Sequence, residues 1–224
     1  MLVRIKRQTG PEAAPYWQSF SYDGPKHVTV SAVLDALNYT DDLFDTEGKP
    51  APRIRWECSC MQAVCGGCAM VINGVPALAC ATFADEVKAD TLVLEPLSKF
   101  PVVADLIVDR SLIYEQLKQA KTYLESLAVS SKGQYKQQYS VAKCLKCGLC
   151  LEVCPNYRPG GEFFGAVLAN ESYLTASQSA EKNHQVVKEY KTHFGAGCSK
   201  ALSCQSVCPM EIETITSIMR MNRK

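Results

Sequence analysis

The sequence predicts an α+β fold in two parts, with β-strands concentrated in residues 1–100 and α-helices in residues 101–224. Three observations support this division. Apolar and polar residues alternate along several short segments of the first part, as they do in half-buried strands. Apolar residues of the second part recur at helical spacing instead. Finally, the twelve cysteines form three groups, and each part of the chain contains at least one group.

Two segments near the N-terminus, MLVRIKRQ and YWQSFSY, alternate like strands and are separated by the turn-rich segment TGPEAAP. A helix is expected next, over VSAVLDALNY, with Thr29 or Ser31 as its N-cap. The apolar face of this helix would consist of Val30, Val33, Leu34 and Leu37.

A hairpin is predicted within AMVINGVPALAC, because Asn73-Gly74 suits a turn in which both central residues need positive φ. The segment TLVLEPL is predicted to be a further strand. A small sheet crossed by one helix, with a cysteine loop between its strands, is the β-grasp arrangement of plant-type ferredoxins. The first part is therefore predicted to be a domain of that type.

The second part has a helical period over VVADLIVDRSLIYEQLKQAKTYLESL, and again over QVVKEYKTHF and EIETITSIMRMN. Between them, SSKGQYKQQYS is polar and rich in turn-forming residues, which predicts an exposed connection. The cysteines of this part would then lie in loops between helices, as in a bacterial-ferredoxin-like domain.

Charge and hydropathy narrow the possible partners and compartment. The net charge is +1, from 24 basic and 23 acidic residues, which argues against a nucleic acid partner. No apolar run approaches bilayer-spanning length, and MLVRIKRQTG does not resemble a signal peptide. A reducing, bacterial-type cytoplasm is therefore expected. There, clustered cysteines indicate metal ligands rather than disulfides.

The first cysteine group has the spacing C-x4-C-x2-C-x11-C, whose first three members match a plant-type [2Fe–2S] centre. The predicted ligands are Cys60, Cys65, Cys68 and Cys80. Gly66 and Gly67 are expected to let the loop turn its amides toward sulfur. A zinc site is the alternative, but zinc usually uses two similar cysteine pairs.

Cys58 stands two residues before the first predicted ligand. In an extended segment, residues i and i+2 point to the same face, so its thiol could lie near the cluster. A free thiol on a strand is the alternative and the preferred interpretation.

The remaining cysteines form two related runs, CLKCGLCLEVCP and CSKALSCQSVCP. The first has the bacterial ferredoxin spacing C-x2-C-x2-C-x3-C-P, and the second lacks one cysteine at Ala201. In two-cluster ferredoxins, the fourth cysteine of such a run binds the other cluster. The predicted [4Fe–4S] ligands are therefore Cys144, Cys147, Cys150 and Cys208.

The second run is left with three thiolates, which suit a [3Fe–4S] cluster. Its predicted ligands are Cys154, Cys198 and Cys204. Two zinc sites could use the same cysteines. However, the prolines that end both runs, Pro155 and Pro209, are typical of ferredoxins.

On these motifs, the chain resembles the iron–sulfur subunit of succinate dehydrogenase and fumarate reductase over essentially its whole length. All eleven predicted ligand positions match, and FPVVADLIVDR resembles the segment that joins the two domains of that family. The resemblance implies an electron-transfer subunit of a succinate:quinone or quinol:fumarate oxidoreductase. Covalently bound FAD and the dicarboxylate site would belong to a flavoprotein subunit, so this chain alone would carry no substrate site.

The same resemblance implies a membrane-anchor subunit, with quinone and any haem there, and a peripheral position on the cytoplasmic face of the bacterial inner membrane. Ubiquinone-reducing members have a tryptophan pair after the first run and a histidine where this chain has Ser199. Here the first run is followed by Pro155-Asn156-Tyr157-Arg158. The segments CGLCLEVCPN and EFFGAVLA resemble menaquinone-linked members. A menaquinone pocket is therefore expected near Pro155 and Ser199.

Two other functions fit parts of the sequence. The same three clusters could serve a related flavin reductase that acts on another α,β-unsaturated acid or uses a soluble electron donor. A non-redox zinc module that assembles other proteins is the third possibility, and the absence of visible charge-transfer absorption would favour it.

Overall fold

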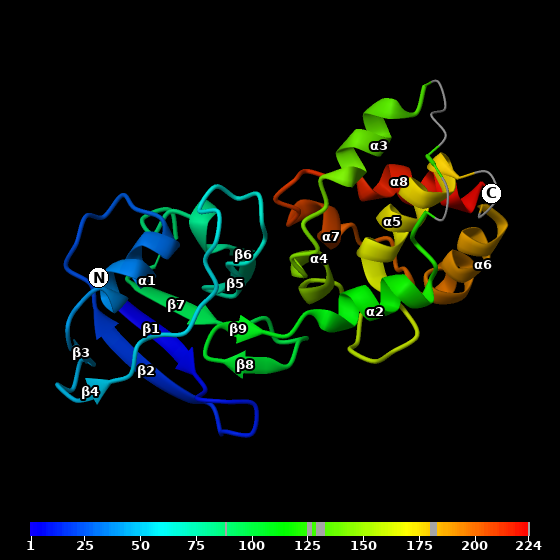
Figure 1. Cartoon of the computed structure of the whole chain (residues 1–224). Helices are drawn as coiled ribbons and strands as arrows, with labels where there is room; N and C mark the ends of the chain where they lie inside the picture. Colours follow the sequence, from blue (N-terminus) through cyan, green and yellow to red (C-terminus); the bar gives the residue numbers. More distant parts are fainter. Residues whose placement is uncertain (88, 125–126, 129–132, 180–182, 224) are drawn as a thin grey trace. The chain divides into compact units, whose positions relative to one another are not determined.

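The computed structural model describes residues 1–87, 89–124, 127–128, 133–179 and 183–223. The chain divides into two compact units, Met1–Asp109 and Arg110–Lys224, and each is described separately. The first is built on a sheet and the second from helices, which confirms the predicted α+β class (Figure 1). The domain boundary predicted between residues 100 and 101 stays a prediction.

The first unit contains a five-stranded mixed sheet in the order β2-β1-β7-β5-β6. Strands β1 and β7 are parallel, and the other neighbours in the sheet are antiparallel. Two small hairpins, β3–β4 and β8–β9, stand outside it. The strands are β1 (Leu2–Arg7), β2 (Tyr16–Ser21), β3 (Leu43–Phe44), β4 (Pro50–Ala51), β5 (Ala69–Ile72), β6 (Val75–Leu78), β7 (Thr91–Glu95), β8 (Val102–Ala104) and β9 (Ile107–Val108).

Helix α1 (Val30–Asn38) forms where the sequence predicts it and buries its predicted apolar face. Thr29 is the N-cap, and its Oγ1 accepts a hydrogen bond from Ala32 N at 3.3 Å. Ser31 is instead buried inside the first turn, with its hydroxyl 2.9 Å from that of Thr29. A short 3-10 helix, η1 (Ala79–Ala81), follows β6 and contacts α1.

The Asn73-Gly74 hairpin is confirmed, with φ of 45° at Asn73 and 80° at Gly74. The Asn73 side chain also joins the hairpin to β7. Its Nδ2 donates to Thr91 O and its Oδ1 accepts from Val93 N, both at 2.8 Å. This residue therefore sets the turn and the position of the neighbouring strand together.

The helix predicted from residue 102 is wrong over its first residues, which form the β8–β9 hairpin. Asp105 stands at the turn with φ of 47°, and its buried carboxylate accepts hydrogen bonds from Gln8 N and Arg55 N, both at 2.9 Å. These tertiary contacts outweigh the helical period. The helix begins later, as α2 (Ser111–Gln119), and residues 125–126 of the prediction lie outside the described residues.

Helices of the second unit pack around α5 (Gly165–Gln178), which contacts α2, α3, α4, α6 and α8. The sequence did not predict α5. The segment predicted as an exposed connection is wrong from residue 135 on, because residues 135–140 form most of α3, in which Gln138 is buried. Residues 130–132 of that segment lie outside the described part. The other helices are α3 (Tyr135–Ala142), α4 (Leu149–Glu152), α6 (Asn183–His193), η2 (Gly195–Gly197), α7 (Ser203–Ser206) and α8 (Thr214–Asn222).

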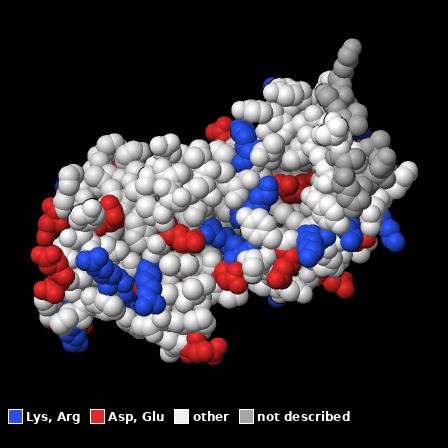
Figure 2. All heavy atoms as spheres, in the orientation of Figure 1, with Lys and Arg blue, Asp and Glu red and all other residues white. Residues whose placement is uncertain are grey.

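Two of these agree with the helical patterns noted in the sequence, α6 with QVVKEYKTHF and α8 with EIETITSIMRMN. On the face drawn in Figure 2, basic and acidic side chains are interspersed over each unit. Both signs of charge are therefore present on this face of each unit.

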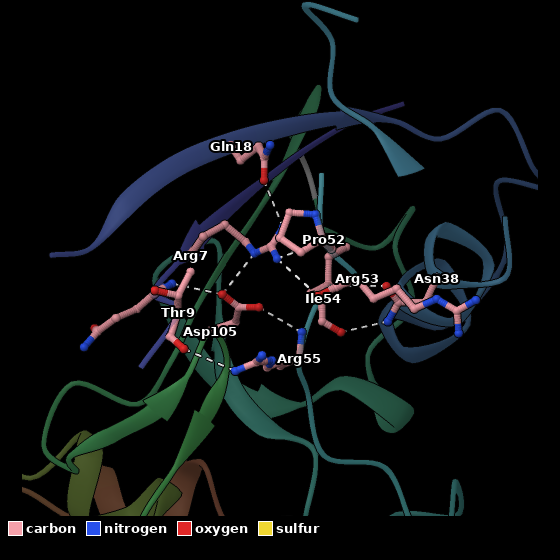
Figure 3. Close-up of polar contacts among 10 residues, drawn as sticks. Arg7, Thr9, Gln18, Asn38, Pro52, Arg53, Ile54, Arg55 and Asp105 are labelled. Carbon is pink, nitrogen blue, oxygen red and sulfur yellow. Dashed lines mark hydrogen bonds and ion pairs between the residues drawn. The ribbon is translucent and has the colours of Figure 1, made fainter. Parts of the chain in front are cut away.

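A buried ion pair closes the core of the first unit (Figure 3). Arg7 follows Val3 and Ile5 on the inward face of β1, and its Nε lies 3.0 Å from Asp105 Oδ1. Both side chains are almost completely buried. The guanidinium also donates to Gln18 Oε1 at 2.9 Å and to the carbonyls of Pro52 and Arg53 at 3.0 and 3.2 Å. One side chain thus connects β1, β2, the β8–β9 turn and the segment that leads to the first cysteine group.

Replacement of Arg7 with methionine is expected to lower the free energy of unfolding by about 3–5 kcal/mol, because Asp105 would remain buried without its partner. Urea unfolding followed by far-UV circular dichroism measures this loss. The matched control is Lys6→Met on the same strand, whose partly exposed ion pair with Glu95 is expected to contribute less than about 1 kcal/mol. Equal losses from the two variants would contradict the role given to Arg7.

Candidate metal centres

The cysteine loop of the first unit directs backbone amides at thiol sulfurs. Four N–H donors reach three of the predicted ligands: Gln62 N and Val64 N donate to Cys60 Sγ (3.3 and 3.4 Å), Ala63 N to Cys80 Sγ (3.3 Å) and Gly67 N to Cys65 Sγ (3.5 Å). Cys68 Sγ lies 3.3 Å from Cys80 Sγ, so the distant fourth cysteine returns to the loop. N–H groups around cysteine sulfurs stabilise the negative charge of an iron–sulfur cluster.

Left-handed residues produce this arrangement. Met61, Ala63 and Gly66 have φ of 54°, 58° and 77°, so the loop reverses direction repeatedly within a few residues. Gly66 thus behaves as the sequence predicts. Gly67 does not have positive φ, and a Cβ there would meet Cys65 Sγ at an ordinary 3.7 Å. Met61 and Ala63 thus adopt a left-handed conformation that is more usual for glycine, which costs about 1 kcal/mol or more for each residue.

The local environment lowers the pKa of one thiol in this loop and raises the pKa of another. Hydrogen bonds from the backbone amides of Gln62 and Val64 lower the pKa of Cys60 to about 7. Burial raises the pKa of Cys68 to about 12. A thiolate binds iron, so Cys60 reaches the form that a metal requires more readily than an ordinary cysteine, whereas Cys68 needs the positive charge of iron to ionise.

The two cysteine runs of the second unit have the same local conformation. Lys146 and Gly148 have φ of 52° and 89° in the first run, and Lys200 and Leu202 have 60° and 58° in the second. In each run, the two left-handed residues follow the first cysteine by two and by four positions. A four-residue helix then begins in each run, α4 or α7. In this alignment of the two runs, Ala201 occupies the position equivalent to Cys147, as the sequence predicts.

A cavity in the second unit brings cysteines of both runs together. The cysteines that line it are Cys144, Cys147, Cys150, Cys204 and Cys208. All four predicted [4Fe–4S] ligands are among them, together with one cysteine predicted for the neighbouring cluster. The remaining lining is mainly apolar and includes Leu149, Val167 and Ile212.

Burial raises the pKa of most thiols at this site. The pKa of Cys144 is raised to about 11, and those of Cys147 and Cys150 also lie above the ordinary value. Burial likewise raises the pKa of Cys204, and the nearby thiols of Cys154 and Cys198 add to this effect. Desolvated thiols in such proximity resist ionisation, and bound iron ions would remove this penalty.

Within the described residues, no three His, Cys, Asp or Glu side chains have the geometry to hold a single metal ion. Cluster ligands bind different iron atoms, so their sulfurs need not converge on one point. The donor set, amide pattern and apolar lining fit iron–sulfur clusters.

The two residues of the expected quinone pocket, Pro155 and Ser199, are both exposed. Their neighbourhoods are connected by a hydrogen bond from Asn156 Nδ2 to Gly197 O. No sequence pattern indicated the partner of Lys146, whose Nζ lies 2.7 Å from Glu171 Oε1 beside the first run. Glu171 belongs to α5, which no sequence pattern had identified.

Comparisons with known proteins agree with the division of the chain into a sheet unit and a helical unit that each contain cysteine groups. Residues 2–115 match the family model of a 2Fe-2S iron-sulfur cluster binding domain, and residues 140–212 match that of a 4Fe-4S dicluster domain. Fold and site together define an iron–sulfur protein of the ferredoxin class, with a [2Fe–2S] centre in the sheet unit and [4Fe–4S]-type chemistry in the helical unit.

Similar proteins identify the family within this class of iron–sulfur proteins. The chain is 30% identical to the succinate dehydrogenase iron-sulfur subunit of Bacillus subtilis, over 98% of this chain and 90% of the relative. It is 29% identical to the fumarate reductase iron-sulfur subunit of Escherichia coli O6:H1, over 94% and 87%. The chain therefore belongs to the family of succinate dehydrogenase and fumarate reductase iron–sulfur subunits. A chain of the Mycobacterium smegmatis Sdh1 complex has the same fold, with a TM-score of 0.73 and 23% identity over 100% of this chain and 96% of that one.

Cys58 is distinct from the other cysteines of its loop. Its Sγ lies 3.3 Å from Met61 Sδ, and burial, followed by Asp35 and the neighbouring thiols, raises its pKa. Cys58→Ser is expected to retain the [2Fe–2S] EPR signal at full intensity. Cys65→Ser is the matched control, because Cys65 is also exposed but accepts an amide hydrogen bond, and it is expected to lose or alter the signal. Loss of the signal in correctly folded Cys58→Ser would contradict the assignment of Cys58 as a cysteine that does not bind the cluster.

Proposed function

We propose that this chain is the electron-transfer subunit of a succinate:quinone or quinol:fumarate oxidoreductase. The observation that carries the proposal is its correspondence, over nearly its full length, to iron–sulfur subunits of both kinds of enzyme. The clusters supply one-electron redox steps between the FAD of a flavoprotein subunit and quinone at a membrane anchor. The chain itself holds the clusters, keeps water from them and sets their potentials.

The proposed ligands follow the spacing of the three cysteine groups. The [2Fe–2S] cluster takes Cys60, Cys65, Cys68 and Cys80. The [4Fe–4S] cluster takes Cys144, Cys147, Cys150 and Cys208, and the [3Fe–4S] cluster takes Cys154, Cys198 and Cys204. The amide donors support the first set, the shared cavity supports the second, and the thiols that act on the pKa of Cys204 support the third.

The proposed partners are a flavoprotein subunit and one or more membrane-anchor subunits. No described helix is long and apolar enough to cross a membrane. We propose that the chain lies peripherally on the cytoplasmic face of the bacterial inner membrane, in contact with such an anchor. Residues 58–84 contain no charged residue, and Met61 and Val64 are exposed there. Such a surface around the [2Fe–2S] loop suits contact with another subunit.

Menaquinone is the proposed quinone, with Pro155 and Ser199 at its pocket. Both residues are exposed, and each directly follows a proposed [3Fe–4S] ligand: Pro155 follows Cys154, and Ser199 follows Cys198. The support is the absence of the tryptophan pair and of the histidine that ubiquinone-reducing members carry at these positions.

The complex, purified anaerobically from its native host through a tag on this chain, is expected to be active in at least one of two assays. These are succinate oxidation with a quinone acceptor and fumarate reduction with a menaquinol analogue. If the complex is inactive in both assays although flavin and three clusters are present, the proposal that it acts on succinate or fumarate is contradicted. Such inactivity would favour a flavin reductase for another α,β-unsaturated acid.

Ala201→Cys is expected to convert the three-iron centre to a four-iron centre, because residue 201 occupies the position of Cys147 in the other run. EPR should show loss of the [3Fe–4S] signal, and the potential should fall by at least about 59 mV, a tenfold change for one electron. The matched control is Ser206→Cys, which adds an exposed thiol outside this register and should keep the three-iron signal. A retained three-iron signal in Ala201→Cys, with the new thiol free to react, would disprove the register.

A further inference from the structure

The cavity that holds the proposed [4Fe–4S] ligands contains few polar side chains besides the cysteines. Three described residues supply them: Lys146, Asn170 and Thr214. The Lys146 ammonium is paired with Glu171 at 2.7 Å, so its charge is largely compensated. Asn170 and Thr214 are both buried, and Asn170 Nδ2 lies 3.1 Å from Thr214 Oγ1.

The amide of Asn170 is only half satisfied. Its Nδ2 bonds to Thr214, whereas its Oδ1 is buried without a hydrogen-bond partner. The other such atoms in the described residues are Arg7 Nε, Glu171 Oε1 and Ser172 Oγ. The first two lie in ion pairs. A buried polar atom without a hydrogen-bond partner destabilises a protein, so the place of Asn170 Oδ1 suits a group that can form a hydrogen bond with this side chain.

A half-turn of the Asn170 side-chain amide exchanges its oxygen and nitrogen without moving other atoms. The Thr214 hydroxyl can donate as well as accept, so it satisfies the amide in either orientation. In the turned orientation, Thr214 donates to Oδ1, and the N–H groups occupy the place where a partner is missing. Because cluster sulfurs carry negative charge, they attract an N–H donor and repel a carbonyl oxygen.

We propose that Asn170 donates a side-chain N–H hydrogen bond to a sulfur of the [4Fe–4S] centre and raises its reduction potential. The proposal rests on the function and ligand assignment given above. Reduction adds negative charge to the cluster, and a hydrogen-bond donor stabilises the reduced form more than the oxidised one. Asn170 is therefore a residue that sets the potential of the centre without binding iron.

The test is an EPR-monitored redox titration of the purified complex. Asn170→Leu keeps a similar side-chain volume but removes the donor. We expect its [4Fe–4S] potential to fall by about 59 mV, a tenfold loss of electron affinity for one electron. The [2Fe–2S] potential in the same sample should not move. The matched control is Ser172→Ala, which removes another unpartnered buried polar atom from α5 at a residue outside the cavity lining, and it should leave both potentials unchanged.

A second measurement does not depend on the stability of a variant. Wild-type complex with ¹⁵N only in the side-chain amides of asparagine should show a ¹⁵N hyperfine coupling to the reduced [4Fe–4S] centre in pulsed EPR. An unmoved potential in Asn170→Leu, or a missing coupling in the wild type, would overturn the role of Asn170 while the clusters remain. Absence of the [4Fe–4S] signal from wild type would overturn the proposed function itself, and this inference with it.

Discussion

The structure depends on one constraint, which is that many thiol sulfurs must be held close together inside protein. Ionised thiols repel one another and lose solvation on burial, as the raised pKa of Cys144 indicates. The chain meets this constraint with left-handed residues that turn the backbone back on itself beside the cysteines. Met61 and Ala63 do so in the first loop, and Lys146 and Lys200 do so in the two later runs.

A different interaction holds the scaffold around the first cysteine loop. The buried contact of Arg7 with Asp105 holds the strand core, the β8–β9 turn and the chain that enters the first cysteine loop. Alternation along β1 places Arg7 at a core position, where a lone charge would be unstable. In the second unit, the Lys146–Glu171 pair is less completely buried than this one, and the core there is formed mainly by the apolar packing of α5 against its neighbouring helices.

Periodicity predicted the elements whose stability is mainly local. Strand β1, helix α1 and the Asn73-Gly74 hairpin formed where their patterns indicated. It failed where tertiary contacts decide the conformation. Asp105 draws residues 102–108 into a hairpin, despite the helical period there. Helix α5 escaped prediction because it is buried on nearly all sides, so it lacks the polar face that marks an amphipathic helix.

The sequence by itself determined the family, the cluster types expected and the register that aligns Ala201 with Cys147, because metal-ligand spacing is a local property of the chain. Only the tertiary structure decided which side chains surround those ligands. Glu171 and Asn170 come from α5, and Thr214 begins α8, so their proximity to the cysteine cavity arises from helix packing. Spacing along the chain carries no information about contacts made between distant segments.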